Sequence, residues 1–572
     1  MKIKGRITEV KGTVVKASGV SGIQMNEMVK VGEMGLIGEV VRVEGDSAYV
    51  QVYEFTTGLK PGEPVEGLGS PLSVTLAPGI VGNIYDGLQR PLSTLEGYTI
   101  SRGYTAEAVD INKTWHFVPV VKPGIKVQGG EKIGYVEETE LIRHYIMVPP
   151  NVSGTLTYVA PEGDYKVTDQ IAEVQDSKKQ SVSMLQRWAV RIPRPIKRRL
   201  VASEPLITGQ RVIDTFFPLA KGGSAAVPGG FGTGKTVLLH QMASWANSRV
   251  VVYVGCGERG NEMVELLKTF PKLNDPISGK PIMQKSIMIA NTSNMPVAAR
   301  EASIYVGITL AEYYRDMGYD SLMLADSTSR WAEALREISG RLEEIPAEEG
   351  YPSYLASRIA SFYERAGYVE TLSGDFGSVS IIGAVSPPGG DFTEPVTTHT
   401  LRYVKAFWLL DPNLAYSRHY PAVNWVSSYS SYVESLSEWW SLNVSDEFET
   451  LRKKALDILF KEESLRNIVR LLGPEVLPED EKLLLEAANM LKEGFLKQNA
   501  YHEVDRYTPP LVQYYLLKLI ISFYEKAKEK LTKGATVEEI RSSPLYLEVI
   551  RARFNVKSKE DFDAIMKKVM EF

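Results

Sequence analysis

One stretch near the middle of the chain is spelled like a phosphate-binding loop. Residues 229–236 read GGFGTGKT and fit the pattern G-x-x-x-x-G-K-[ST]. Glycines allow a tight turn whose N–H groups face an anion, Lys235 can reach the β- and γ-phosphates, and the Thr236 hydroxyl can bind Mg²⁺. The expected phosphate-loop residues are Gly229, Gly230, Phe231, Gly232, Thr233, Gly234, Lys235 and Thr236.

A chance match in a glycine-containing loop is the alternative. The flanking residues argue against it, because residues 224–227 form a short apolar run suited to a strand and the residues from 237 onward suit a helix. A strand, this loop and a helix in that order are the context that a true phosphate loop requires.

Charged residues follow two further apolar runs. Residues 250–254 (VVVYV) lead to Glu258 and Arg259, and residues 321–325 (SLMLA) lead to Asp326. Parallel strands carry ligand-binding groups at their carboxyl ends, so Asp326 is a candidate Mg²⁺ ligand, directly or through water. Glu258 could polarise an attacking water, and Arg259 could stabilise the charge that develops on the transferred phosphoryl group. The alternatives are an N-cap role for Asp326 and a salt bridge for Glu258, with Arg259 or a neighbouring subunit.

Composition narrows the class of protein. A chain of 572 residues is too long for one core and suggests three or four domains. Its formal net charge of −5 argues against a dedicated nucleic-acid binder, and a single cysteine excludes an internal disulfide and suits a reducing compartment. The basic run at 191–199 (RIPRPIKRR) is expected to be a solvated linker, with a polyanion site as the alternative. We expect no signal peptide and no membrane-spanning segment.

The pattern of the whole chain predicts a multidomain α/β protein. Alternation and glycine turns predict an N-terminal β-barrel over 1–75, followed by a connecting segment over 76–109. Residues 110–190 predict a β-rich insertion with strand-like runs such as 121–127 and 153–159; a biotin- or lipoyl-type carrier is the weaker alternative. Residues 191–433 predict a P-loop (RecA-like) α/β domain and 434–572 a helical bundle, with one apolar face formed by Leu484, Ala487, Ala488, Leu491 and Phe495.

Five motifs, in this order, resemble those of the catalytic A subunits of archaeal and vacuolar-type rotary ATPases. They occupy residues 228–236, 255–263, 324–334, 386–395 and 421–430, and the resemblance also covers residues 86–91. It implies that Glu258 is the catalytic glutamate and that 110–190 is the bulge domain of A subunits. It also implies that Tyr420 and Tyr501 lie against adenine, although packing in the helical core is the alternative for both rings. Vacuolar forms can carry a cysteine at the position of Thr233, so redox control by that route should be absent.

The resemblance further implies a catalytic subunit of an A-type/V-type ATP synthase that makes or hydrolyses MgATP, coupled to H⁺ or Na⁺ transport. Its nucleotides would be ATP and ADP, with Mg²⁺. Its partners would be non-catalytic B subunits in an alternating A₃B₃ ring, each supplying an arginine finger in trans, together with central stalk, peripheral stalk and membrane sector, and no nucleic acid. The complex would lie on the cytoplasmic side of the cell membrane. Two alternatives remain, a non-catalytic subunit of the same ring and a hexameric nucleic-acid translocase of related core. Protein-export ATPases of this core would be shorter and lack the insertion.

Overall fold

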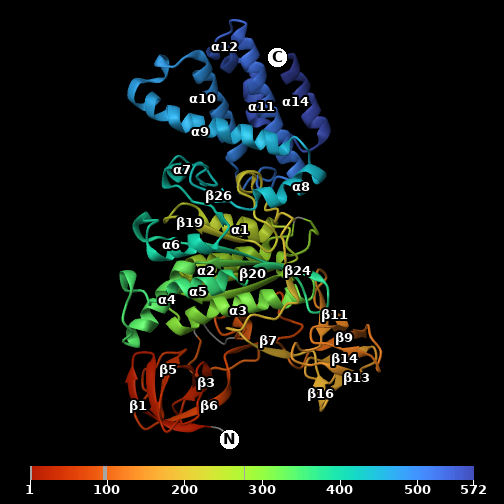
Figure 1. Ribbon diagram of the computed structural model, residues 1–572, viewed down its shortest axis with the longest axis vertical. Coiled ribbons are helices and arrows are strands. Elements are labelled where there is room, and N and C mark those ends of the chain that lie inside the picture. Colours follow the sequence, from red (N-terminus) through yellow and green to blue (C-terminus); the bar gives the residue numbers. More distant parts are fainter. Residues whose placement is uncertain (1–2, 95–99, 276) are drawn as a thin grey trace. The chain divides into compact units, whose positions relative to one another are not determined.

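The structure, a computed structural model, describes residues 3–94, 100–275 and 277–572 and forms two compact units (Figure 1). The first unit consists of Met1–Val201, Ser248–Pro387 and Asp391–Tyr403, and the second of Ala202–Asn247, Pro388–Gly390 and Val404–Phe572.

The first unit begins with a closed β-barrel, coloured red in Figure 1. Its strands pair in the order β1-β2-β5-β4-β3-β6, and its core consists of small and branched apolar side chains such as Val15, Val29 and Val50. The predicted alternation of buried and more exposed residues is clearest in the first part of β5, where Ala48 and Val50 are buried and Ser47 and Tyr49 less so, whereas β3 is buried at four of its five residues. The strands are β1 (Lys4–Lys11), β2 (Val14–Ser18), β3 (Glu27–Val31), β4 (Leu36–Glu44), β5 (Ser47–Val52) and β6 (Pro64–Pro71).

A second β-rich part follows, and its two sheets pair in the orders β10-β13-β15-β16 and β12-β11-β9-β14. β7 (Ser73–Leu76) pairs with β17 (Gln186–Ala189) on either side of it in the sequence. The strand-like run at 121–127 is mostly not a strand, because Pro123 removes a donor and Gly124 turns with φ +97. The strands are β9 (Thr114–Pro119), β10 (Lys126–Val127), β11 (Lys132–Glu137), β12 (Arg143–Met147), β13 (Gly154–Val159), β14 (Gly163–Lys166), β15 (Ala172–Gln175) and β16 (Lys179–Val182).

The rest of the first unit is an α/β layer whose parallel strands pair β24 to β22, β22 to β20, β20 to β21 and β21 to β8. These strands are almost wholly buried, as expected for a parallel sheet covered by helices. β23 (Gly367–Glu370) and β18 (Arg198–Leu200) extend it antiparallel. The other elements are β8 (Ile84–Tyr85), β20 (Val250–Glu258), β21 (Ser286–Thr292), β22 (Asp320–Asp326), β24 (Phe376–Val385), α2 (Gly260–Thr269), α3 (Val297–Asp316), α4 (Thr328–Arg341), α5 (Leu355–Tyr363) and α6 (Pro395–Tyr403).

The second unit joins a short sheet to a helical bundle. β19 (Ser224–Pro228) pairs parallel with β25 (Ala406–Phe407), which pairs antiparallel with β26 (Tyr429–Ser430). α1 (Lys235–Trp245) follows β19, and two π-helical turns, η2 (Val212–Phe216) and η8 (Lys492–Leu496), also belong to this unit. The remaining helices are α7 (Pro412–Tyr416), α8 (Val433–Asn443), α9 (Phe448–Leu472), α10 (Glu479–Leu491), α11 (Pro510–Thr532), α12 (Val537–Ser542), α13 (Pro544–Asn555) and α14 (Lys559–Glu571).

The expected apolar face of α10 is correct for Ala487, Ala488 and Leu491, which are buried. Leu484 is only half-buried, and the helix ends at Leu491, so that Phe495 enters the core from η8. A π-helical turn changes the angular step between residues, and an uninterrupted 3.6-residue period therefore could not predict it. Within 3–94, 100–275 and 277–572, no helix is long and apolar enough to cross a membrane.

The basic run at 191–199 matches the expected solvated linker only in part. Arg191 pairs with Glu39 and Glu301, and Arg194 is buried with its Nε 2.5 Å from Asp316 Oδ2. Lys197 and Arg198 both pair with Glu370, and the Arg199 guanidinium donates to the backbone carbonyls of residues 364 and 366. Arg191 and Arg194 therefore tie segments of the first unit together, whereas Lys197, Arg198 and Arg199 are exposed, as expected for a linker.

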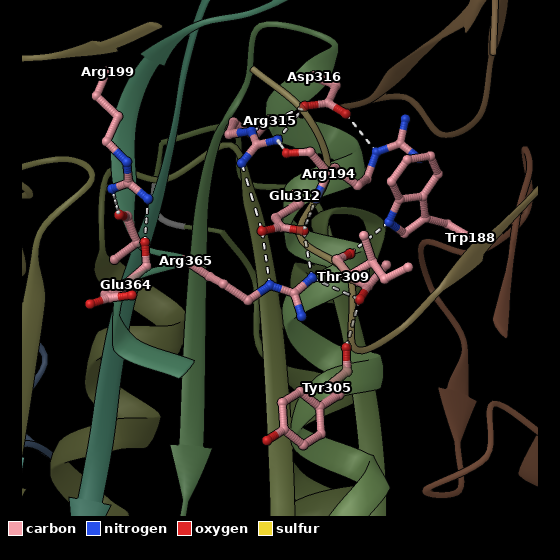
Figure 2. A network of polar contacts seen from close by, with 12 residues as sticks. Trp188, Arg194, Arg199, Tyr305, Thr309, Glu312, Arg315, Asp316, Glu364 and Arg365 are labelled. Carbon is pink, nitrogen blue, oxygen red and sulfur yellow. Dashed lines mark hydrogen bonds and ion pairs between the residues drawn. The ribbon is translucent and has the colours of Figure 1, made fainter. Parts of the chain in front are cut away.

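Glu312 of α3 is the centre of a buried polar network (Figure 2). Arg365 Nε and Nη2 donate to its two carboxylate oxygens at 2.9 and 2.5 Å, and the Arg194 backbone N–H donates to it at 3.0 Å. Arg365 Nη1 also donates to the Val190 carbonyl at 2.7 Å. A carboxylate removed from water needs such charged, bidentate partners. The network thereby fixes α3, the start of the basic run and the residues after α5 to one another.

Replacing Glu312 by alanine should destabilise the first unit strongly, because the buried Arg365 guanidinium would keep its charge and lose its partner. We expect a loss of about 3–5 kcal/mol, seen as a lower midpoint of thermal unfolding. The matched control is Glu529→Ala, which removes an exposed i,i+3 partner of Lys526 and should leave the midpoint nearly unchanged. Equal midpoints for the two variants would show that the network contributes no stability.

Candidate functional site

The phosphate loop lies in the second unit, between β19 and α1. Gly232 and Gly234 have φ of +78 and +84, where any side chain would be strained. Gly229 is required for another reason, since a Cβ there would lie 2.6 Å from Thr233 Oγ1 and 2.8 Å from Leu410 Cβ. By contrast, the space beside Gly230 is open, with no atom within 4 Å of the place that a Cβ would take. The loop therefore keeps its backbone accessible on one side.

The basic and hydroxyl groups of the loop are arranged around its own backbone. Lys235 Nζ donates to the Gly229 carbonyl at 2.7 Å, and Thr233 Oγ1 donates to the Gly230 carbonyl at 2.8 Å. α1 begins at Lys235 with Gly234 as its N-cap and no side-chain cap, so its first N–H groups are those that a bound anion can satisfy. Phe231 is exposed and Thr236 is half-buried in the first turn of α1. These groups fit a bound phosphate.

The structure brings Tyr420 to this loop. The edge of its ring lies 3.2 Å from where a Cβ on Gly234 would stand. The Tyr420 carbonyl accepts a hydrogen bond at 2.7 Å from the backbone N–H of Gln498, three residues before Tyr501. Tyr420 is 40% exposed and Tyr501 84% exposed, so packing in the helical core does not account for either ring. Both rings remain accessible to a flat apolar group.

Asp326 lies in the first unit as the last residue of β22 and is buried. The Tyr253 hydroxyl of β20 donates to its Oδ2 at 2.9 Å. Burial, and then the charge of Asp326, raise the pKa of Tyr253 well above its usual value, so this hydroxyl keeps its proton. The N-cap of α4 is Ser327 and not Asp326, which removes the main structural alternative for this carboxylate. Its position at a strand end suits a metal ligand.

Glu258 ends β20, and Arg259 is the exposed N-cap residue of α2. Gly257 before them has φ +73, and a Cβ there would lie 2.7 Å from Arg330 Cβ. The charge of Glu258 contributes to the raised pKa of Arg330, whose largest cause is its hydrogen bond to Glu333. A cation of α4 is therefore held near the candidate catalytic carboxylate.

Sequence reasoning gave no role to Tyr253 or Arg330. The first could have been noticed as a hydroxyl inside the apolar run 250–254, and the second as a charge within the motif at 324–334. Neither sequence pattern predicts which carboxylate lies beside the residue, because these contacts depend on how β20, β22 and α4 pack together.

Cys256 is buried in β20, and its thiol lies 3.4 Å from the Arg300 carbonyl. Burial raises its pKa to about 12, so it is protonated and unreactive at neutral pH. Within the ranges that the structure describes, no three His, Cys, Asp or Glu side chains gather to hold a metal ion.

The sequence matches four protein-family descriptions along its length. They are the nucleotide-binding domain of the ATP synthase alpha/beta family over residues 209–430, the barrel-sandwich domain of its subunits over 106–191, its beta-barrel domain over 7–69, and the C-terminal domain of V and A type ATP synthase over 437–541. Among solved structures, the assembled ATPase EscN of the enteropathogenic E. coli type III secretion system has a TM-score of 0.65 at 18% identity, covering 90% of this chain and 100% of that chain. This likeness shows the shared fold.

Curated relatives are similar over nearly the whole chain. The A subunit of the A-type ATP synthase of Hyperthermus butylicus is 59% identical, covering 98% of this chain and 95% of the relative. That of Methanopyrus kandleri is 56% identical, covering 100% and 98%. Identity at this level over full length confirms the predicted multidomain fold, with its barrel, nucleotide-binding and C-terminal domains. The chain therefore belongs to the family of A subunits of A-type ATP synthases.

Proposed function

We propose that this chain is the catalytic subunit of a rotary ATP synthase and binds and turns over MgATP. The observation that carries the proposal is the phosphate loop, which combines a left-handed glycine backbone, a lysine and a helix N-terminus without a side-chain cap, as an anion site does. The relatives favour this function over a hexameric nucleic-acid translocase. A candidate catalytic glutamate, Glu258, favours it over a non-catalytic subunit of the same ring.

We assign the nucleotide to the second unit. The backbone of residues 229–234 and the Lys235 ammonium would hold the phosphates, after Lys235 exchanges its bond to the Gly229 carbonyl for a phosphate oxygen. Tyr420 and Tyr501 would face the adenine of ATP or ADP. Thr236 would offer its hydroxyl to Mg²⁺, which supplies charge neutralisation when it is bound.

We assign the chemistry to the first unit. Asp326, oriented by the Tyr253 hydroxyl, would bind Mg²⁺, directly or through water. Glu258 would accept a hydrogen bond from the attacking water and polarise it. Arg259 would stabilise the charge that develops on the transferred phosphoryl group. Phosphoryl transfer needs positioning and charge stabilisation more than covalent chemistry. Metal binding, polarisation of the water and charge stabilisation are therefore the contributions that we assign to the first unit.

We propose that other subunits complete the enzyme. A non-catalytic B subunit in an alternating A₃B₃ ring would supply an arginine finger, worth about 10³–10⁵ in rate. At the C-terminal end of α9 lies an exposed apolar group, Ile468, Leu471, Leu472 and Val476, with Leu471 83% exposed. Exposed apolar patches mark interaction sites, and the central stalk is the partner that we assign to this one. The peripheral stalk and a membrane sector moving H⁺ or Na⁺ would complete the complex on the cytoplasmic face of the membrane.

Lys235→Ala should weaken MgATP binding to the full chain by about 10- to 100-fold, since it removes a charge-assisted hydrogen bond. Isothermal titration calorimetry measures this directly. Lys461→Ala is the control, because Lys461 is an exposed lysine of α9 that pairs with Asp457. Unchanged affinity in Lys235→Ala would refute the phosphate-binding role of the loop.

Glu258→Gln should leave MgATP binding intact and lower ATP turnover by about 10²–10⁴ in a ring reconstituted with a B-type subunit. The amide keeps the shape of the side chain but is a poor acceptor for the proton of the attacking water. Glu265→Gln, on the exposed face of α2, is the matched control and should turn over normally. Near-normal hydrolysis in Glu258→Gln would return Glu258 to a structural role.

A further inference from the structure

The loop that carries Tyr501 is held by a buried arginine from a distant part of the second unit. Arg211 is fully buried at the N-terminus of η2. Its Nε donates to the Phe495 carbonyl at 2.6 Å, its Nη1 to Thr508 Oγ1 at 2.8 Å and its Nη2 to the Lys497 carbonyl at 2.7 Å. Its Nη2 also forms an ion pair with Asp505 Oδ1 at 2.8 Å. These contacts all reach residues 495–508, which we call the tyrosine loop.

Gln498, in the tyrosine loop, forms hydrogen bonds to two other segments of the second unit, one through its side chain and one through its backbone. Its Oε1 accepts from the Arg211 backbone N–H at 2.9 Å, and its Nε2 donates to the Gly209 carbonyl at 2.7 Å. Its own backbone N–H donates to the Tyr420 carbonyl at 2.7 Å. The side chain is thus bonded to the segment before β19, while the backbone is bonded to the tyrosine beside the phosphate loop. Gln498 fixes both aromatic positions to the same frame.

The tyrosine loop is also fixed from its two flanks. Tyr507 stacks on Trp245, the last residue of α1, with ring centroids 5.4 Å apart. That contact needs Gly209, where a Cβ would lie 2.0 Å from the Tyr507 ring. On the other flank, Arg553 of α13 donates to the Lys497 carbonyl and lies 3.6 Å from Asp505 Oδ2. The loop is therefore held between the helix that starts at the phosphate loop and a helix of the C-terminal bundle.

We propose that Gln498 is a positioning residue for the base of the nucleotide, holding Tyr501 and Tyr420 in register with the phosphate loop. The inference rests on the proposed function, because it assumes that these two tyrosines face adenine. Tyr501 is exposed, and a loop that is ordered in advance lets its ring bind a base without an added entropy cost of ordering. The buried side-chain bonds of Gln498 supply that order at a distance from the phosphates.

This arrangement predicts a split between two ligands. MgATP uses both the phosphate loop and the tyrosines, whereas magnesium tripolyphosphate uses the phosphate loop alone. Gln498→Leu keeps the approximate size of the side chain. It leaves the buried Arg211 N–H without its acceptor and removes one of the two hydrogen bonds to the Gly209 carbonyl, which keeps the one from the Thr508 N–H. We expect MgATP to bind about 5- to 50-fold more weakly, with the affinity for magnesium tripolyphosphate unchanged within about 2-fold.

The experiment is calorimetric titration of the full-length chain with each ligand. Gln51→Leu is the matched control, because Gln51 is an equally buried amide, 2% exposed, bonded to Thr13 in the barrel, and its loss should change neither affinity. Thr508→Val removes the hydroxyl that accepts from both Arg211 and Gln498. It should weaken MgATP binding less than Gln498→Leu does and leave the binding of magnesium tripolyphosphate unchanged. This variant keeps the test valid if Gln498→Leu does not fold.

Equal weakening of both ligands in Gln498→Leu and Thr508→Val, or no change in either, would overturn the inference, since Gln498 would then be a general structural residue or of no consequence. If the unaltered chain binds magnesium tripolyphosphate as tightly as MgATP, the adenosine contributes no affinity. The assignment of Tyr420 and Tyr501 then fails, and the inference fails with it. If the unaltered chain binds neither ligand, the proposed function itself is refuted. A split confined to Gln498 and Thr508 variants supports the positioning role.

Discussion

A loop that holds an anion with its backbone N–H groups needs a backbone conformation that only glycine adopts without strain or steric clash. At Gly232 and Gly234 the chain adopts that conformation with left-handed φ values, and at Gly229 even a single carbon would collide with Thr233 and Leu410. Much of the second unit serves this constraint. β19 precedes the loop, α1 begins directly after it without a side-chain cap, and Tyr420 packs directly against the last glycine.

Each unit is further organised by an arginine taken out of water. In the first unit Arg365 meets Glu312, and in the second Arg211 meets Asp505 and three other acceptors of the tyrosine loop. A buried guanidinium is tolerated only when nearly all of its donors are used, so each of these side chains fixes several segments at once. The consequence differs between the units. Glu312 fixes segments around the parallel sheet. Arg211 and Gln498 instead fix the tyrosine loop, whose Tyr501 ring is exposed and does not pack in the core.

The local features of the site could be predicted from the sequence because they are encoded locally. The phosphate-loop spelling, the apolar run before Asp326 and the alternation of the barrel strands each occupy one continuous stretch, and the structure has β19, β22 and β1–β6 there. The partners of buried charges could not be predicted. Arg194 pairs with Asp316, 122 residues away in the sequence, and Gln498 bonds to Gly209, 289 residues away. Nothing in the local sequence of the basic run or around Gln498 indicates these partners. For the same reason the expectation of a solvated linker at 191–199 missed the ion pairs of Arg191 and Arg194, although Lys197, Arg198 and Arg199 are exposed.

The central claim is that this chain is the catalytic partner in a two-component ring. The most direct test mixes the purified chain with a B-type subunit of a related A-type ATP synthase and measures assembly by native mass spectrometry and ATP turnover on the same sample. We expect an alternating ring of three copies of each component that hydrolyses ATP, with little turnover from either component alone. A ring without turnover, or turnover by this chain alone at the same rate, would contradict it.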